Sequence, residues 1–371
     1  MFTGYICSYT ADGMHGGGNG AGIARIALDP VRARLEVIRT FPGQCPTWMA
    51  IAPDGRHAYA TNETTGFDGT RQGSITAYAF DGDGDPVRLN AVASGGTGPA
   101  HCSVDPTGRF VLVANYASGH LAVLPIRGDG SLGPATDVKA PPGDPGPTIA
   151  AHAPPGSFAR SGHDASHAHM IGADPSGRFV LSNDLGTDRT QIWTLSEAGV
   201  LAPDDPAFIP AASAGAGPRH FAFHPNCRFL YNLYEEASEL AVYAWDARHG
   251  AATLLQLATT LPNGFAGSSF ASAIAVADDG RFLYTANRLH NSIAIFAVAD
   301  DGRVRLLDTE WTRGDYPNHI ALDPTGGVMI ACNRRSDQAT VFRVDRGTGG
   351  LAFTGQYVPL GSPNMAVFAG R

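Results

Sequence analysis

Gly217-Pro218-Arg219-His220-Phe221 begins a predicted β-hairpin, which turns at His224-Pro225-Asn226-Cys227 and returns from Arg228 to Tyr234. Side chains alternate between the two faces of a strand. A hairpin also brings the start of its first strand beside the end of its second. We therefore expect Arg219 and Glu235 to lie at the same end of this hairpin, with a cation close to an anion.

The same hairpin pattern recurs along the chain about every 50 residues. In each unit the first strand leads into a tight turn, and a second apolar run that ends near Asn follows the turn. A third apolar run comes next, and a Gly/Asp turn follows it. The turns are Pro53-Asp54-Gly55-Arg56, Asp105-Pro106-Thr107-Gly108-Arg109, Asp174-Pro175-Ser176-Gly177-Arg178 and Asp278-Asp279-Gly280-Arg281, with weaker copies at His224–Arg228 and Asp323–Gly327. Four short strands per unit at this period predict a β-propeller.

The two ends of the chain together supply a seventh unit. Ser362–Phe368 matches the first strand of a unit, after which the chain stops. Gly4–Tyr9 matches a second strand, and Gly22–Leu28 matches a third. We therefore predict an all-β, seven-bladed β-propeller, a single domain over residues 1–371, whose N- and C-terminal strands share one blade and close the ring without a free sheet edge.

Three long loops are expected on one face of this propeller, opposite the tight turns. They are Ala11–Gly20, Thr64–Gln72 and the insertion Pro141–Gly162, which is rich in Pro, Gly, Ala and His. Functional residues are concentrated on loops that a rigid scaffold positions. We expect the insertion to pack over the channel mouth beside His169 and to narrow access to it.

Two positions of each unit should surround the mouth of the central channel on the long-loop face. They hold Thr47, Ala100, His169, Arg219, Ser272, Asn318 and Asn364, and Tyr9, Glu63, Tyr116, Leu185, Glu235, Arg288 and Arg334. Convergent charges in a concavity favour a functional site. Structural ion pairs between blades are the alternative interpretation.

Histidines outside this ring are expected to have structural roles. His101, His220 and His319 each follow a ring position by one residue, so alternation predicts that they face away and pack between blades. His167 shares a strand face with His169, but a zinc site needs three or four convergent ligands, and no suitable partner is spaced to join them. We expect neither a metal nor a cofactor, since Gly16-Gly17-Gly18 lacks the Lys-Ser/Thr of a phosphate loop.

Composition restricts the partners and the location. The formal net charge of −8 argues against nucleic acid, and no apolar run is long enough to span a bilayer. The five cysteines are isolated from one another, which is typical of reduced thiols in a cytoplasmic protein. We expect a cytoplasmic monomer or weak homodimer that acts on a small molecule, without a nucleic-acid or membrane partner.

Several motifs together resemble a known family, the seven-bladed propeller lactonases. They are Ser166-His167-Ala168-His169, Asn183–Arg189, Gly217-Pro218-Arg219-His220, Tyr234-Glu235 and Asn287–Ala294. The family includes bacterial 6-phosphogluconolactonases and carboxy-cis,cis-muconate cyclase, and the resemblance covers essentially the whole chain. It implies a metal-independent hydrolase of a sugar (aldono-)lactone, phosphorylated or not, with the family's catalytic residues at His169, Arg219, Glu235 and Arg288.

The chemistry of these side chains suits lactone hydrolysis. Glu235 or His169 is the general base in this interpretation, and arginine suits an oxyanion or an anionic substrate group. Five further ring residues and one neighbour, His167, are candidates for substrate binding; the five are Tyr9, Glu63, Tyr116, Asn318 and Arg334. Two alternatives stay open: a muconate-type cycloisomerase that uses the same residues, and a non-catalytic propeller that binds a sugar acid or a protein.

Overall fold

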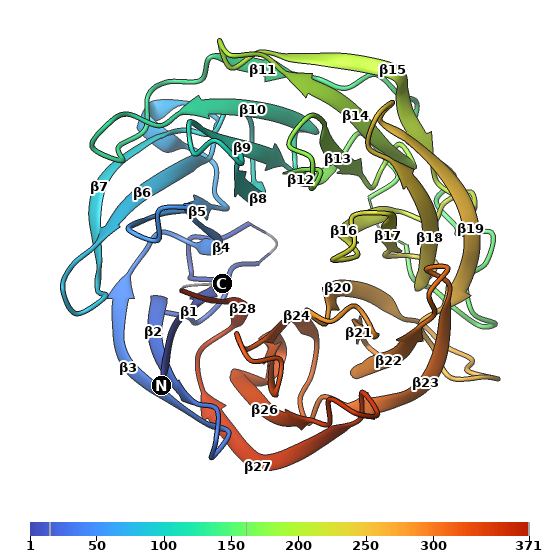
Figure 1. Cartoon of the computed structure of the whole chain (residues 1–371). Coiled ribbons are helices and arrows are strands. Elements are labelled where there is room, and N and C mark those ends of the chain that lie inside the picture. Colours follow the sequence, from blue (N-terminus) through green and yellow to red (C-terminus); the bar gives the residue numbers. More distant parts are fainter. Residues whose placement is uncertain (15, 161, 370–371) are drawn as a thin grey trace.

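The computed structural model describes residues 1–14, 16–160 and 162–369. Its strands form seven antiparallel four-stranded sheets, which are arranged as blades around one axis (Figure 1). The predicted seven-bladed β-propeller is therefore confirmed. Blades 1 to 6 are numbered in chain order from the first complete sheet, and blade 7 is the sheet that both ends of the chain build.

Within each blade, successive strands lie in order from the innermost to the outermost. Blades 1 and 2 contain β4 (Pro46–Ile51), β5 (His57–Asn62), β6 (Ser74–Phe80), β7 (Pro86–Ala93), and β8 (Pro99–Val104), β9 (Phe110–Asn115), β10 (His120–Pro125), β11 (Asp137–Lys139). Blades 3 and 4 contain β12 (Ala168–Ala173), β13 (Val180–Asp184), β14 (Arg189–Leu195), β15 (Leu201–Pro210), and β16 (Pro218–Phe223), β17 (Phe229–Tyr234), β18 (Glu239–Asp246), β19 (Ala251–Thr259).

The remaining blades follow the same order. Blades 5 and 6 contain β20 (Phe270–Val276), β21 (Phe282–Arg288), β22 (Ser292–Val298), β23 (Val304–Trp311), and β24 (Pro317–Leu322), β25 (Val328–Asn333), β26 (Gln338–Val344), β27 (Leu351–Pro359). Blade 7 contains β28 (Pro363–Phe368), β1 (Phe2–Ser8), β2 (Gly22–Asp29) and β3 (Arg34–Pro42). Two short 3₁₀ helices occur in loops, η1 (Phe67–Gly69) and η2 (Arg334–Ser336).

Blade 7 closes the ring in the predicted manner. β1 pairs antiparallel with β28, with Tyr5 opposite Val367 and Ile6 opposite Ala366. β28 in turn contacts the innermost strands of both neighbouring blades, β24 and β4. The N-terminal strand therefore completes a sheet that the C-terminal strand begins, and the innermost strands form an uninterrupted ring.

Buried tyrosines join one blade to the next. The hydroxyl on the second strand donates a hydrogen bond to a glycine carbonyl in the outer turn of the following blade, from Tyr59 to Gly130 (3.1 Å), from Tyr231 to Gly302 (3.1 Å) and from Tyr284 to Gly349 (3.0 Å). Each tyrosine side chain fills the apolar space between two sheets with its phenol ring, while its hydroxyl group keeps a hydrogen-bond partner. The repeated unit therefore includes a contact between blades as well as the blade itself.

Every innermost strand carries a β-bulge at the same point. Pairing with the second strand skips one residue near the start of the strand; the skipped residues are Thr47, Ala100, His169, Arg219, Ser272, Asn318 and Asn364. A bulge leaves this residue unpaired and interrupts strict alternation. The skipped residue and the one after it can then both face the propeller axis.

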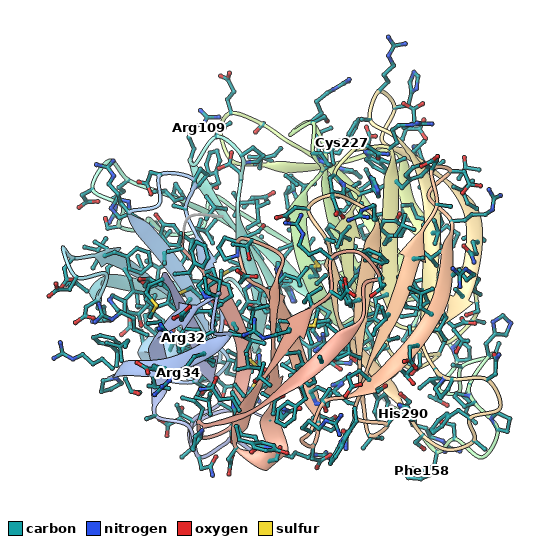
Figure 2. The ribbon with its side chains drawn as sticks, turned by 60° about the horizontal axis from the view of Figure 1, so that its bottom comes forward. Arg32, Arg34, Arg109, Phe158, Cys227 and His290 are labelled. Atoms are coloured by element: carbon teal, nitrogen blue, oxygen red, sulfur yellow. The ribbon has the colours of Figure 1, made fainter. Side chains whose placement is uncertain are left out.

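The two faces of the ring differ as predicted. Figure 2 shows Arg109 and Cys227, which belong to tight turns, at one end, and His290 and Phe158 at the other. Phe158 belongs to the insertion Pro141–Gly162, which therefore lies on the long-loop face. All five cysteines are free, and only Cys227 is exposed. Among the described residues there is no helix with the length and hydropathy required to cross a membrane.

Candidate active site

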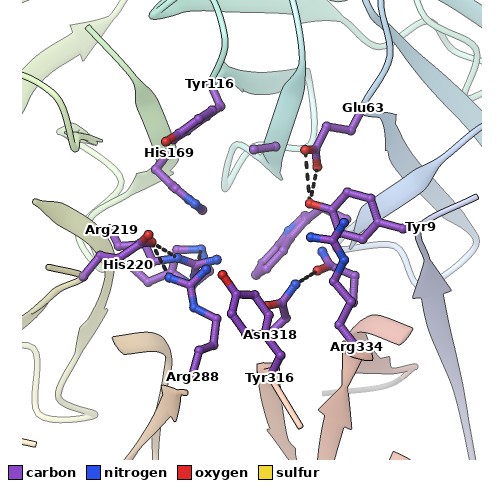
Figure 3. Close-up of a pocket in the computed structure, with 14 residues that line it drawn as sticks. Tyr9, Glu63, Tyr116, His169, Arg219, His220, Arg288, Tyr316, Asn318 and Arg334 are labelled. Atoms are coloured by element: carbon purple, nitrogen blue, oxygen red, sulfur yellow. Dashed lines mark hydrogen bonds and ion pairs between the residues drawn. The ribbon is translucent and has the colours of Figure 1, made fainter. Parts of the chain in front are cut away.

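A pocket of about 230 Å³ opens at the propeller axis on the long-loop face (Figure 3). Its lining residues are Tyr9, Trp48, Glu63, Ala100, Tyr116, His169, Arg219, His220, Glu235, Arg288, Tyr316, Asn318, Arg334 and Asn364. All predicted ring residues are present except Thr47, Leu185 and Ser272, which are buried in the wall. The volume is below the usual range for drug-sized ligands, so the pocket suits a small molecule.

One side of the pocket is built around Glu235, which follows β17. Its Oε2 forms ion pairs with Arg219 Nε at 2.7 Å and with Arg288 Nη2 at 2.7 Å. The hairpin prediction that Arg219 and Glu235 meet is confirmed, and the neighbouring blade adds the second guanidinium. A carboxylate between two guanidiniums leaves a net positive charge on this side, which favours an anionic group of a substrate or a developing oxyanion.

Backbone carbonyl groups fix both arginines. Arg219 donates to the carbonyl oxygen of Ser272, and Arg288 Nη2 donates to that of Ala271 at 3.3 Å. Burial and the nearby positive charge of Arg288 lower the pKa of Arg219 to about 10, so it is still a cation at neutral pH. Glu235 raises the pKa of Arg288 above its ordinary value, against the effect of its burial. The two cations are therefore held in fixed positions before a ligand arrives.

His169 is the bulged residue of β12, and its imidazole points into the pocket (Figure 3). Its ring lies 5.4 Å from that of Tyr116 and 5.1 Å from that of His220. Burial, followed by the positive fields of Arg219 and Arg288, holds its pKa well below the ordinary value. The buried Nδ1 has no hydrogen-bond partner among the described residues. His169 is therefore a neutral imidazole at neutral pH, able to accept a proton.

The opposite side of the pocket contains a second buried carboxyl group, that of Glu63. The Tyr9 hydroxyl donates to it, at 3.1 Å from Oε1 and 3.0 Å from Oε2. The Arg334 guanidinium lies flat over the Tyr9 ring, with its Cζ 3.7 Å from the centroid, and donates to the Gly17 carbonyl oxygen at 3.1 Å. Within the described part of the chain, Arg334 forms no ion pair with Glu63.

Aromatic and imidazole rings close the floor of the pocket. The Trp48 ring centroid lies 4.4 Å from that of His101, 5.3 Å from that of His220 and 5.3 Å from that of His319. Burial lowers the pKa values of His101 and His319 to about 3, so this layer is uncharged. Nδ1 of His101 also accepts from the Ile171 amide of the next blade at 3.4 Å, as expected for a histidine between blades.

The prediction for His220 is wrong in part. His220 lines the pocket instead of only packing between blades, because the bulge at Arg219 turns two consecutive side chains toward the axis. The equivalent bulge at Thr47 in blade 1 explains why Trp48 was missed. The signal available in the sequence was the recurring Pro at the start of the innermost strand, as in Pro46, Pro218 and Pro317, which marks a position without a ladder hydrogen bond.

His167 does not line the pocket, which contradicts its predicted place in substrate binding. Its ring stacks on Tyr116 with a centroid distance of 4.6 Å, and its ring nitrogens lie 2.9 Å from the Tyr116 carbonyl oxygen and 2.9 Å from Asp164 Oδ1. His167 precedes the bulge of β12, so it is on the far side of Tyr116 from the ligand space. It supports the orientation of that tyrosine.

The insertion Pro141–Gly162 does not cover the pocket. Apart from Ser161, which lies outside the described residues, none of its members lines the cavity. Its backbone bonds to the loops of successive blades, through Gly146 N to Gly186 O (2.8 Å), Ala151 N to Ala214 O (2.8 Å) and Gly267 N to Pro155 O (2.9 Å). These bonds hold the segment along the rim, so the expected lid over the mouth is wrong.

A groove of about 470 Å³ continues from the pocket past Tyr316 and Arg334. The Arg335 guanidinium lies over the Tyr316 ring, with its Cζ 3.7 Å from the centroid. Asp337 is in the same groove, but its carboxylate accepts from Asn19 Nδ2 at 2.7 Å and from the Ser362 amide at 2.8 Å. Neither Arg334 nor Arg335 has an ion-pair partner among the residues that the structure covers, and with Asp337 as the carboxylate in the lining the groove keeps a net positive charge.

Residues 3–368 match the model of a protein family described as "Lactonase, 7-bladed beta-propeller". The chain belongs to this family. It is 31% identical to the 6-phosphogluconolactonase of Bacillus subtilis, over 99% of this chain and 98% of that one. It is 30% identical to the 6-phosphogluconolactonase of Pectobacterium carotovorum, over 88% of this chain and 89% of that one. The structure of a periplasmic gluconolactonase from Pseudomonas aeruginosa superposes with a TM-score of 0.87 at 28% identity, covering 100% and 99% of the two chains.

The cationic groups in the pocket of this lactonase-family propeller are arginine side chains. No group of three or more His, Cys, Asp or Glu side chains that could hold a metal ion is found in residues 1–14, 16–160 and 162–369. The charged chemistry of the pocket instead comes from Arg219, Arg288 and Arg334. These three arginines, the two carboxyl groups of Glu63 and Glu235, and the His169 imidazole are the groups from which a mechanism can be built.

Proposed function

We propose that this protein hydrolyses an aldonolactone by general acid–base catalysis. The proposal depends most on one observation: His169 and the Arg219–Glu235–Arg288 cluster face the same small pocket. The lactonase family and the names of the relatives from Bacillus and Pectobacterium support it. Nothing in the proposed chemistry calls for a metal or a cofactor.

His169 acts as the general base in this proposal. Its neutral imidazole takes a proton from a water molecule as the water oxygen adds to the lactone carbonyl carbon. The carbonyl oxygen becomes an oxyanion, which Arg219 and Arg288 stabilise. Glu235 is less suited to be the base because its Oε2 is already ion-paired with both guanidiniums. Its role is to hold the two cations at the position where negative charge develops.

The direct test is hydrolysis of glucono-δ-lactone and its 6-phosphate by the wild-type protein. A pH near 6 keeps spontaneous hydrolysis slow, and proton release gives a continuous readout. We expect saturable acceleration that survives prior treatment with EDTA. Absence of acceleration on both lactones would refute the proposal, and loss of activity on chelation, restored by a divalent metal, would refute a metal-free mechanism.

The groove at Arg334 and Arg335 favours a substrate with an anionic group distant from the lactone carbon, such as a phosphate. Arginine binds phosphate with paired hydrogen bonds, each worth about 1.5–3 kcal/mol when charged groups are involved. We expect Arg335→Ala to lower kcat/KM for 6-phosphogluconolactone by about 10- to 100-fold, and to lower that for gluconolactone much less. The ratio of the two kcat/KM values is the measurement.

The control for this prediction is Arg346→Ala. Arg346 is an exposed arginine in the tight turn between β26 and β27, on the opposite face of the ring. Arg346→Ala removes the same charge and should leave the ratio of the two kcat/KM values unchanged. If Arg335→Ala lowered kcat/KM equally for both lactones, the groove would not bind the phosphate group.

A muconate-type cycloisomerase remains the second candidate from the sequence, and the pocket favours it less. A diacid requires two cationic sites. Among the described residues, Arg334 is the only cation that lines the pocket opposite the Arg219–Glu235–Arg288 cluster, and it already donates to the Gly17 carbonyl oxygen. Loss of the conjugated-diene absorbance would reveal this activity. The cytoplasmic location and the monomeric or weakly dimeric state stay predictions, and the similar gluconolactonase from Pseudomonas is described as periplasmic.

A further inference from the structure

The pocket holds two buried carboxyl groups in opposite surroundings. Glu63 is 4% exposed and Glu235 is 6% exposed. Glu235 is ion-paired with two guanidiniums, while Glu63 accepts hydrogen bonds from the neutral hydroxyl of Tyr9. Figure 3 shows Glu63 across the ligand space from Arg219 and Arg288, the two arginines that pair with Glu235. A buried carboxyl group without a counter-ion favours its protonated form, and one between two cations favours its ionised form.

We propose that Glu63 is the general acid of the reaction, the group that protonates the ring oxygen as it leaves the lactone carbon. This inference rests on the proposed lactonase function and names a proton donor for it. Pairs of acidic groups whose surroundings drive them to different protonation states commonly divide the acid and base roles of a hydrolase. Glu63 lines the pocket across from the oxyanion-stabilising arginines, where a leaving oxygen can be reached.

The step balances within the pocket. After water has added to the carbonyl carbon and given its proton to His169, the bond between this carbon and the ring oxygen breaks. The oxyanion re-forms a carbonyl group, and the ring oxygen takes the bonding electron pair together with the proton of Glu63. The product is the open-chain hydroxy acid. Glu63 is then a carboxylate and His169 an imidazolium, and a proton returned between them, through solvent, restores the starting state.

The groups around Glu63 agree with this role. Burial raises its pKa to about 7, against the hydrogen bonds from Thr47 and Tyr9 and the fields of Arg334 and Arg219. Tyr9 and Cys45 also face it. Burial raises the pKa of Tyr9 well above its ordinary value and that of Cys45 to about 12, so neither group titrates near neutrality. Glu63 is therefore the group in this cluster expected to lose its proton as pH rises past 7.

The test compares wild type, Glu63→Gln and Glu63→Asp on glucono-δ-lactone from pH 5 to 8. Because the acid must be protonated, wild-type kcat/KM should fall as pH rises above about 7. Glutamine keeps the shape and the bond to Tyr9 but supplies no acidic proton. We expect it to lower kcat by about 10²-fold with little change in KM, and to remove the alkaline fall. Aspartate should restore part of kcat, and kcat/KM should again fall as the pH rises. Glu36→Gln, on the exposed strand β3, is the matched control.

The outcomes separate the two proposals. A wild-type protein without lactonase activity would refute the proposed function itself. An active wild type whose Glu63→Gln variant keeps kcat within about threefold, or loses only substrate affinity, would refute the acid role and leave the lactonase intact. If Glu63→Gln does not fold, the wild-type profile still decides: kcat/KM that stays level between pH 6.5 and 8, after subtraction of the spontaneous rate, contradicts the inference.

Discussion

Replacing His169 by asparagine should lower kcat for gluconolactone hydrolysis by about 10²- to 10⁴-fold, the usual contribution of a general base. Asparagine keeps a polar side chain of similar reach but cannot take up the proton of the attacking water. KM should change little, because Arg219, Arg288 and Asn318 still line the pocket. Initial rates at pH 6, with the spontaneous rate subtracted, measure the effect.

The pH profile supplies an independent check on His169. Its pKa lies well below the ordinary histidine value, so the base stays unprotonated as the solution is acidified past pH 6.5. Wild-type activity should therefore persist there and decline only at lower pH. The matched control is His249→Asn in an exposed turn, which should behave as wild type. Equal rates for His169→Asn and His249→Asn would remove His169 from the mechanism.

Glu235→Gln should have the largest effect on stability, and a large one on activity as well. The substitution leaves the buried guanidiniums of Arg219 and Arg288 without their shared anion. Removing one partner of a buried ion pair typically destabilises a protein by about 3–5 kcal/mol. We also expect kcat to fall by about 10²- to 10³-fold, because the cations that stabilise the oxyanion lose their fixed positions. Urea unfolding and initial rates measure the two effects.

Glu310→Gln provides the comparison for an ion pair near the surface. Glu310 pairs with Arg313, and the two side chains are 23% and 31% exposed. Such pairs contribute about 0–1 kcal/mol. A destabilisation by Glu235→Gln no larger than that by Glu310→Gln would mean that Arg219 and Arg288 find other partners, and the assigned role of Glu235 would then be wrong.

Most of this fold could be predicted from the sequence because the turn motif and the strand pattern repeat along the chain. The turn at Asp105 illustrates why: its carboxylate accepts from the amides of Thr107, Arg109 and Phe110, so the residues that recur are those that the turn geometry requires. Period-two alternation then placed Glu235 and Arg288 correctly at strand ends. It failed at His220, because the unpaired Arg219 before it changes which face the next side chain occupies.

The positions of residues outside the strands could not be predicted from periodic patterns in the sequence. Tyr316 lines the pocket from a loop and has a φ of 62°, and no periodic pattern marks such a residue. The insertion was assigned to the correct face but the wrong position on it. Its course depends on bonds to distant loops, such as that between His152 and Glu239 (2.9 Å), which local sequence does not encode. Charge–charge contacts across blades, as between Glu235 and Arg288, required the ring to be known first.

The pairing of β1 with β28 also has a consequence for synthesis. Among the strands of this propeller, β1 is translated first and its inner partner β28 last. Until then one edge of β1 has no backbone partner, and the innermost strands cannot form a complete circle. The pocket, whose lining runs from Tyr9 to Asn364, is therefore assembled only after translation of nearly the whole chain. The native partner of the inner β1 edge is thus absent until β28 has been made, and the circle of innermost strands around the cavity can close only then.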